Sequence, residues 1–135
     1  MNAGSDGVPG FQPALLAELE AARARRTVLT YRQLIARLQL PVPAMRPLTA
    51  ALESLVADDA RRGWPLRAAL VVSQAGSRLP RSGFFECAER AGACPGGLSD
   101  QAQAHWHAAE LERVFAFAYP GQAVARGTVS SGPGI

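Results

Sequence analysis

Apolar side chains recur at helical spacing in five stretches of the chain, and this pattern predicts five helices. The helices are expected over 13–26, over 31–40, from the Pro43 or Pro47 turn to Gly63, from about Gly83, and over 99–119. Two short runs rich in apolar and β-branched residues, 27–30 and 67–73, predict strands that can pair with each other. The order of elements is therefore helix, strand, helix, helix, strand, helix, helix.

Residues that begin or end helices stand at the expected boundaries. Pro13 suits a first helical turn, where its missing N–H costs nothing. Thr30 and Ser99 precede helical patterns and are candidate N-caps, and Gly63 is a candidate helix stop.

This order of elements is that of a winged helix, which predicts a mostly helical α+β fold. It comprises a winged helix-turn-helix with a small β-sheet and an added C-terminal helix. The wing is the loop after the second strand, with Arg78 and Arg81. We expect residues 1–10 to form a flexible arm, residues 11–118 the domain, and residues 119–135 a flexible tail.

Charge is distributed unevenly along the chain. All fourteen basic residues are arginine. Residues 11–81 hold eleven arginines and five acids, whereas residues 82–135 hold three arginines and five acids. A basic first part is typical of a DNA-facing half, although an ordinary solvated surface would give the same split.

No apolar run approaches membrane-spanning length, so we expect no membrane partner. The first ten residues lack the features of a secretory signal, and two cysteines make no disulfide framework. We expect a cytoplasmic protein, associated with the nucleoid if it binds DNA.

One part of the chain resembles a known family. The stretches "TYRQLIARLQLP", "MRPLTAAL", "GWPLRAALVVSQAGSRLP" and "GFF", from about Thr27 to Phe85, are similar to the DNA-binding winged-helix domain of alkylguanine DNA alkyltransferases and alkyltransferase-like proteins. The resemblance implies that Tyr31 helps to turn out a nucleotide and that Arg46 fills the gap in the base stack.

The chain departs from that family where the chemistry would occur. Pro65-Leu66-Arg67-Ala68 stands in place of the family's Pro-Cys-His-Arg, so the nucleophilic cysteine and its histidine are missing. We therefore expect no alkyl transfer and no enzymatic activity. Over nearly its whole length the chain also resembles small bacterial proteins that bring no known activity.

The predicted second helix of the helix-turn-helix carries the candidate base-reading residues, which are Arg46, Thr49, Ala50 and Glu53. In this motif the early residues of that helix reach base edges in the major groove. Arginine can bind guanine and glutamate can accept from cytosine. The alternative is an ordinary exposed helix face.

Further arginines are candidate phosphate contacts, namely Arg32, Arg37, Arg67, Arg78 and Arg81. Four residues are left out of this surface, namely Asp58, Asp59, Arg61 and Arg62, because the two arginines can neutralise the two acids at helical or near-helical spacing.

The C-terminal helix is the candidate surface for a partner chain, since it is rich in aromatic residues: Trp106, Phe115, Phe117 and Tyr119. A homodimer through this helix would place two DNA-binding units on a palindromic site. The alternative is that these side chains close the domain core.

Metal and cofactor sites are not expected. The spacings Cys87-x6-Cys94 and His105-x-His107 differ from those of zinc sites, and no glycine-rich phosphate loop stands between a strand and a helix. We expect no small-molecule substrate. The sequence predicts a non-enzymatic protein that binds double-stranded DNA, in transcription or repair; the alternative is a winged helix that binds only other proteins.

Overall fold

A computed structural model describes residues 11–74, 76 and 78–120 of the chain. Its elements are α1 (Gln12–Arg25), β1 (Leu29–Thr30), α2 (Tyr31–Leu38), α3 (Met45–Arg62), the 3-10 helix η2 (Arg67–Leu70), β2 (Val71–Val72), α4 (Ser82–Arg90) and α5 (Asp100–Ala116). The fold is mostly helical with one small sheet, which confirms the α+β class. The predicted arm (1–10) and most of the predicted tail (121–135) lie outside the described residues.

The predicted helix boundaries rest on local hydrogen bonds. Thr30 caps α2, since its hydroxyl accepts from the Gln33 N–H while the Gln33 side chain accepts from the Thr30 N–H. Ser99 caps α5 by accepting from the Ala102 N–H. Gly63 ends α3 with φ +73°, a left-handed conformation that favours glycine. These three predictions are confirmed.

The two strands pair with each other, as predicted. The structure shows that the pair is parallel, with Leu29 opposite Val71 and Thr30 opposite Val72. The prediction of a strand from 67 to 73 is wrong for its first four residues, which form η2. Side chains from elsewhere bind the backbone of this segment, because Asp59 accepts from the Arg67 N–H and His107 binds the Ala69 carbonyl. The segment therefore has these partners in place of a strand ladder.

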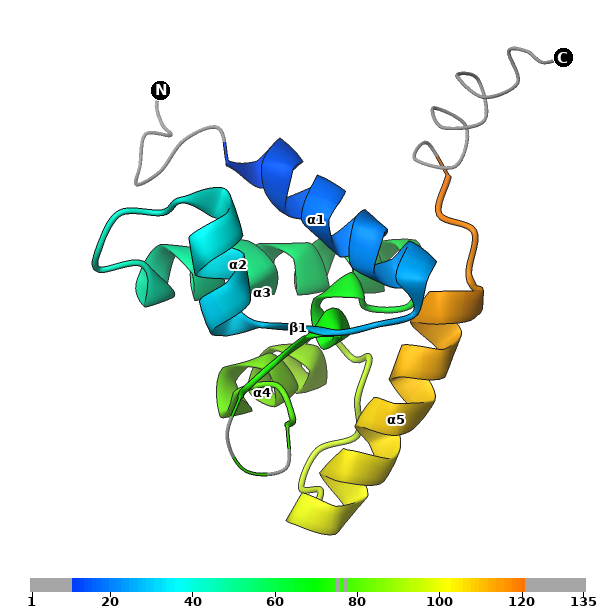
Figure 1. Cartoon of the computed structure of the whole chain (residues 1–135). Helices are drawn as coiled ribbons and strands as arrows, with labels where there is room; N and C mark the ends of the chain where they lie inside the picture. The colour runs from blue at the N-terminus through cyan, green and yellow to red at the C-terminus, as the bar shows by residue number, and fades with distance from the viewer. Residues whose placement is uncertain (1–10, 75, 77, 121–135) are drawn as a thin grey trace, which may run out of the picture.

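The buried η2 segment lies at the centre of the fold and contacts α1, α3 and α5. In Figure 1, α1 crosses the top of the molecule, β1 runs beneath it, and α5 covers the right side. The α2 helix lies at the left, and α3 begins there and runs behind α2 and α1 toward the right. The α3 helix also packs against α4. Its apolar stripe follows the predicted positions Leu48, Leu52, Leu55 and Val56, all of which are buried.

The last helix is shorter than predicted, because α5 ends at Ala116 and an extended segment follows. Tyr119 in this segment is 1 % exposed, and its hydroxyl donates to the Pro65 carbonyl at 2.8 Å. Placing Tyr119 in a flexible tail was wrong, because burial and this hydrogen bond fix it to the domain.

Among the described helices, none combines the length and the apolar character that crossing a membrane requires.

Candidate functional site

A cavity of about 420 Å³ opens between the start of α3 and the start of α4. It is lined by Tyr31, Met45, Arg46, Thr49, Leu52, Glu53, Val56, Ala68, Arg81, Ser82, Gly83 and Phe84. Its walls contain the buried apolar side chains of Leu52, Val56 and Phe84, whereas Arg46 and Arg81 are exposed. The cavity therefore joins an apolar interior to a positively charged surface.

Tyr31 connects the start of α2 to the start of α4. Its hydroxyl accepts a hydrogen bond from the Arg81 N–H at 2.9 Å, and the Arg81 guanidinium lies 5.8 Å from the centre of its ring. Burial raises the pKa of Tyr31, so the hydroxyl keeps its proton at neutral pH. Since Tyr31 is only 6 % exposed, another molecule reaches it through the cavity rather than across the outer surface.

The four candidate base-reading residues on α3 do not share one exposed face. Arg46 and Ala50 are exposed, and Thr49 is half-buried with its hydroxyl donating to the Arg46 carbonyl at 3.1 Å. Glu53 is half-buried beside α4, where a Cβ at Gly83 would lie only 3.2 Å from its Oε2. Arg46 is therefore the member of the set best placed to meet a large partner.

Arg67 was wrongly assigned to the phosphate contacts, because it is buried. It is 6 % exposed, and its guanidinium binds both carboxylate oxygens of Asp59, at 2.8 and 3.1 Å. Sequence reasoning paired Asp59 with its neighbouring arginines instead. One signal was available: Asp59 follows Leu55 and Val56 at helical spacing, so it lies on the apolar stripe and needs a buried partner.

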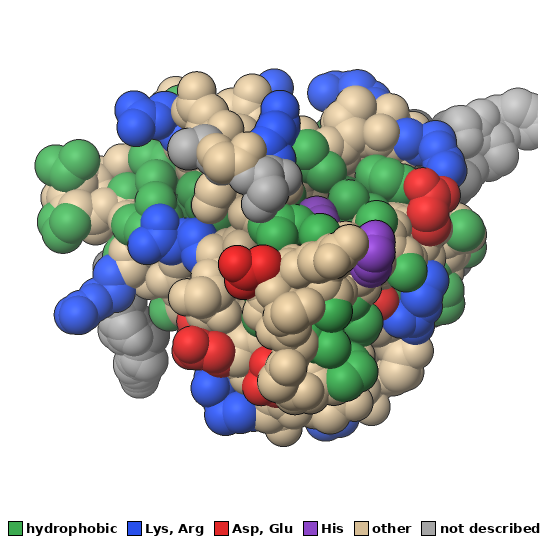
Figure 2. Space-filling model, turned by 90° about the horizontal axis from the view of Figure 1, so that it is seen from below, with side chains coloured by type: hydrophobic (Ala, Val, Ile, Leu, Met, Phe, Trp, Pro, Cys, Tyr) green, Lys and Arg blue, Asp and Glu red, His purple; other side chains and the backbone are tan. Residues whose placement is uncertain are grey.

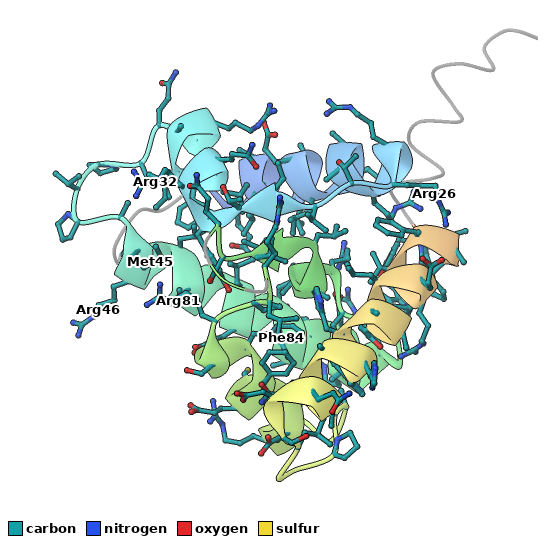
Figure 3. The ribbon with its side chains drawn as sticks, turned by 60° about the horizontal axis from the view of Figure 1, so that its bottom comes forward. Arg26, Arg32, Met45, Arg46, Arg81 and Phe84 are labelled. Atoms are coloured by element: carbon teal, nitrogen blue, oxygen red, sulfur yellow. The ribbon has the colours of Figure 1, made fainter. Side chains whose placement is uncertain are left out.

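The other candidate phosphate contacts are exposed. Arg37 lies 3.6 Å from Glu18 and forms an ion pair with it. In the part of the chain that the structure describes, Arg32, Arg46, Arg78 and Arg81 have no such acidic partner. Figure 3 shows Arg32, Arg46 and Arg81 on the same side of the molecule, with Arg26 at the opposite end.

Acidic side chains are distributed differently. On the face seen from below in Figure 2, arginines in blue lie around most of the rim, and acidic side chains in red lie near the centre, below it and at the right. Arg32, Arg46 and Arg81 thus lie on one side of the molecule, and the exposed Arg25, Arg62 and Arg90 are further arginines without an acidic partner among the described residues.

The aromatic residues near the C-terminus pack against the core. Trp106 contacts the rings of Phe84 and Phe85, and Phe117 contacts Trp64 and Tyr119. Trp106, Phe115 and Phe117 are half-buried, and Tyr119 is fully buried. Naming Tyr119 as a partner contact was therefore wrong, and the others offer only part of their surface to a second chain.

The described residues hold no group of three His, Cys, Asp or Glu side chains arranged to bind a metal ion. His107 is buried with Nε2 at 2.8 Å from the Ala69 carbonyl, while His105 is exposed. Both cysteines are buried, and burial raises the pKa of each thiol.

Comparison with models of protein families found no match to this chain, and comparisons with curated proteins and with solved structures found none either.

Proposed function

We propose that this protein binds double-stranded DNA without catalysing a reaction, in transcription or repair, with α3 directed at the major groove of the duplex. The main support is the set of four exposed arginines, Arg32, Arg46, Arg78 and Arg81, which have no acidic partner among the described residues. Six other arginines form ion pairs with acids, namely Arg23, Arg26, Arg37, Arg61, Arg67 and Arg113. The exposed Arg25, Arg62 and Arg90 also lack an acidic partner among the described residues, but they lie outside the predicted helix-turn-helix and wing.

This difference matters for binding DNA. A guanidinium without an internal partner can bind a phosphate and release a counterion from the duplex. An arginine in an ion pair brings a carboxylate to the same phosphate, and the repulsion offsets much of the attraction. Arg32, Arg46, Arg78 and Arg81 are therefore better suited to contact phosphates than the arginines in ion pairs.

The position of Arg46 supports a winged-helix mode of binding. It is the second residue of α3 and is exposed, and the small Ala50 follows one turn later. The loop between β2 and α4 would be the wing, since its ends are joined by a hydrogen bond from the Ser73 N–H to the Leu79 carbonyl at 2.9 Å. Arg78 and Arg81 belong to this loop.

A non-enzymatic role is consistent with the residues at the place of the alkyltransferase motif. Leu66 is buried, and its N–H donates to Glu110. Ala68, two residues later, lines the cavity. Neither side chain is a nucleophile, so alkyl transfer has no acceptor there.

Fluorescence anisotropy with a labelled random duplex, at several salt concentrations, tests the proposal. We expect micromolar or tighter binding at low salt, with a steep loss as salt rises. Arg46→Ala should weaken binding about ten-fold and reduce the salt slope by about one. Arg61→Ala is the matched control, because Arg61 is exposed at the other end of the same helix and already paired with Asp58.

Absence of binding at low salt would overturn the proposal, and so would equal effects of the two variants. Absence of binding would instead favour a protein-interaction module. The specific observation for that second candidate is Val42, which is 90 % exposed between the exposed Pro41 and Pro43 in the α2–α3 connection.

A further inference from the structure

The cavity between α3 and α4 has the size and the mixed lining of a small-molecule site. Its volume of about 420 Å³ falls within the range of about 300–1,000 Å³ that is usual for ligand pockets. Leu52, Val56 and Phe84 supply a buried apolar wall. An apolar ligand body of a few carbon atoms would replace water there and gain binding free energy.

Hydrogen-bond donors line the same cavity. Arg46 and Arg81 carry guanidiniums without an acidic partner among the described residues. The Tyr31 hydroxyl accepts from the Arg81 N–H, so its own proton is free for another acceptor. Two guanidiniums and one hydroxyl donor suit a carboxylate, because a carboxylate accepts several hydrogen bonds.

Glu53 sets a limit on the charge of the ligand. Its carboxylate lies against Gly83 in the first turn of α4, where the helix dipole favours negative charge. The cavity lining therefore holds two guanidiniums and one carboxylate, a net charge of one positive unit. One ligand carboxylate balances this charge, whereas a second would meet the repulsion of Glu53 without a further cation.

We propose that this cavity binds a small organic monocarboxylate with an apolar body. The carboxylate binds Arg46, Arg81 and the Tyr31 hydroxyl, and the body packs against Leu52, Val56 and Phe84. Ligand binding itself does not depend on the proposed function. One consequence does rest on it: because phosphate and ligand both need Arg46, the ligand weakens binding to DNA.

The first test is a ¹H–¹⁵N NMR titration of the whole protein without DNA, using phenylacetate, phenylacetamide and acetate. Phenylacetate should bind with a dissociation constant below about 1 mM and shift the amide signals of Leu52, Val56, Gly83 and Phe84. Phenylacetamide lacks the charge and acetate lacks the apolar body, so each should bind at least about ten-fold more weakly. Equal binding of either compound would overturn the proposal, as would shifts elsewhere or no shifts.

Variants test the placement of the carboxylate. Arg81→Gln should weaken phenylacetate binding about ten-fold, whereas Arg61→Gln, which removes the same charge far from the cavity, should leave it unchanged. Both positions are exposed, so both variants should fold. If the two variants bind phenylacetate equally, the carboxylate does not lie at Arg81 and the proposed site is wrong.

A competition experiment separates this proposal from the DNA-binding one. Phenylacetate should lower the affinity for duplex DNA of the wild-type protein, and acetate at the same concentration should not. A protein that binds DNA but gives no titration with phenylacetate overturns only the ligand site. A protein that binds phenylacetate but no DNA overturns only the proposed function.

Discussion

Asp59 and Arg67 form the most buried ion pair among the described residues. Asp59 is 0 % exposed, and it accepts from the backbone N–H as well as from the side chain of Arg67. The guanidinium lies 5.5 Å from the ring of Trp64 and 4.9 Å from that of Tyr119. The positive charge of Arg67 is therefore neutralised inside the domain and is not available to a ligand or to DNA.

Removing one member of the pair leaves the other charge buried without a partner. We expect Asp59→Ala to lower the free energy of unfolding by about 3–5 kcal/mol, measured by urea denaturation. Asp58→Ala is the control: Asp58 forms an exposed pair with Arg61, so the loss should stay below about 1 kcal/mol.

A domain of this size can lose its fold after such a change. The double variant Asp59→Ala, Arg67→Met removes both charges and should recover part of the lost stability. Similar stabilities for Asp58→Ala and Asp59→Ala would contradict this account of the pair.

His107 makes stability depend on pH. Burial lowers the pKa of His107, whereas a histidine in an unfolded chain has a pKa of about 6.5. Between these two pKa values the unfolded state binds more protons than the folded state, so the free energy of unfolding falls as pH falls. We expect this loss to begin below about pH 6.5, with a slope of at most about 1.4 kcal/mol per pH unit.

Urea unfolding of His107→Gln and His105→Gln, measured from about pH 7.5 to about pH 5, isolates this contribution. The exposed His105 is two residues away, and its replacement should preserve the pH dependence. His107→Gln should remove part of it. An unchanged slope in His107→Gln would show that other groups cause the loss.

At the scale of elements, predictions succeeded where the determinants are local. The cap of α2 depends on Thr30 and Gln33, three residues apart, so the sequence alone indicates it. The 3-10 helix η2 could not be predicted in this way, because its partners Asp59, His107 and Glu110 come from α3 and α5. When such remote partners are unknown, the short apolar run at this position predicts a strand.

The α2 cap can be tested directly. Thr30→Ala removes the acceptor for the Gln33 N–H and should lower the free energy of unfolding by about 1 kcal/mol. Thr27→Ala changes an exposed threonine before β1 and should have little effect. Thermal or urea unfolding of both variants measures the difference, and equal stabilities would rule out a stabilising cap.

At the scale of the whole molecule, the sequence gives the number of charges but not their pairing. Arg32, Arg46, Arg78 and Arg81 are exposed as the DNA hypothesis requires. Arg67 is buried, where it neutralises Asp59. Tyr31 is buried as well, and its hydroxyl accepts a hydrogen bond from the Arg81 N–H at the start of α4. Ion pairs three residues apart, such as Arg61 with Asp58, follow from local spacing. The pairs of Arg26, Arg37 and Arg67 join residues of different elements, which no local pattern records.

Two double variants with equal net charge separate position from total charge. Arg32→Ala with Arg78→Ala should reduce the salt slope of DNA binding by about two. Arg25→Ala with Arg61→Ala removes the same charge from other parts of the surface and should change the slope much less. Equal slopes in anisotropy titrations would mean that only net charge governs binding.

The hydrogen bonds that hold η2 have a consequence for how the chain folds during synthesis. The Leu66 N–H and the Ala69 carbonyl are bound by Glu110 and His107, about forty residues later in the chain. A nascent chain that leaves the ribosome up to α4 carries the apolar centre of the domain but not the helix that completes it. Before α5 emerges, this centre lacks two of its polar partners, Glu110 and His107, and remains accessible to chaperones and proteases.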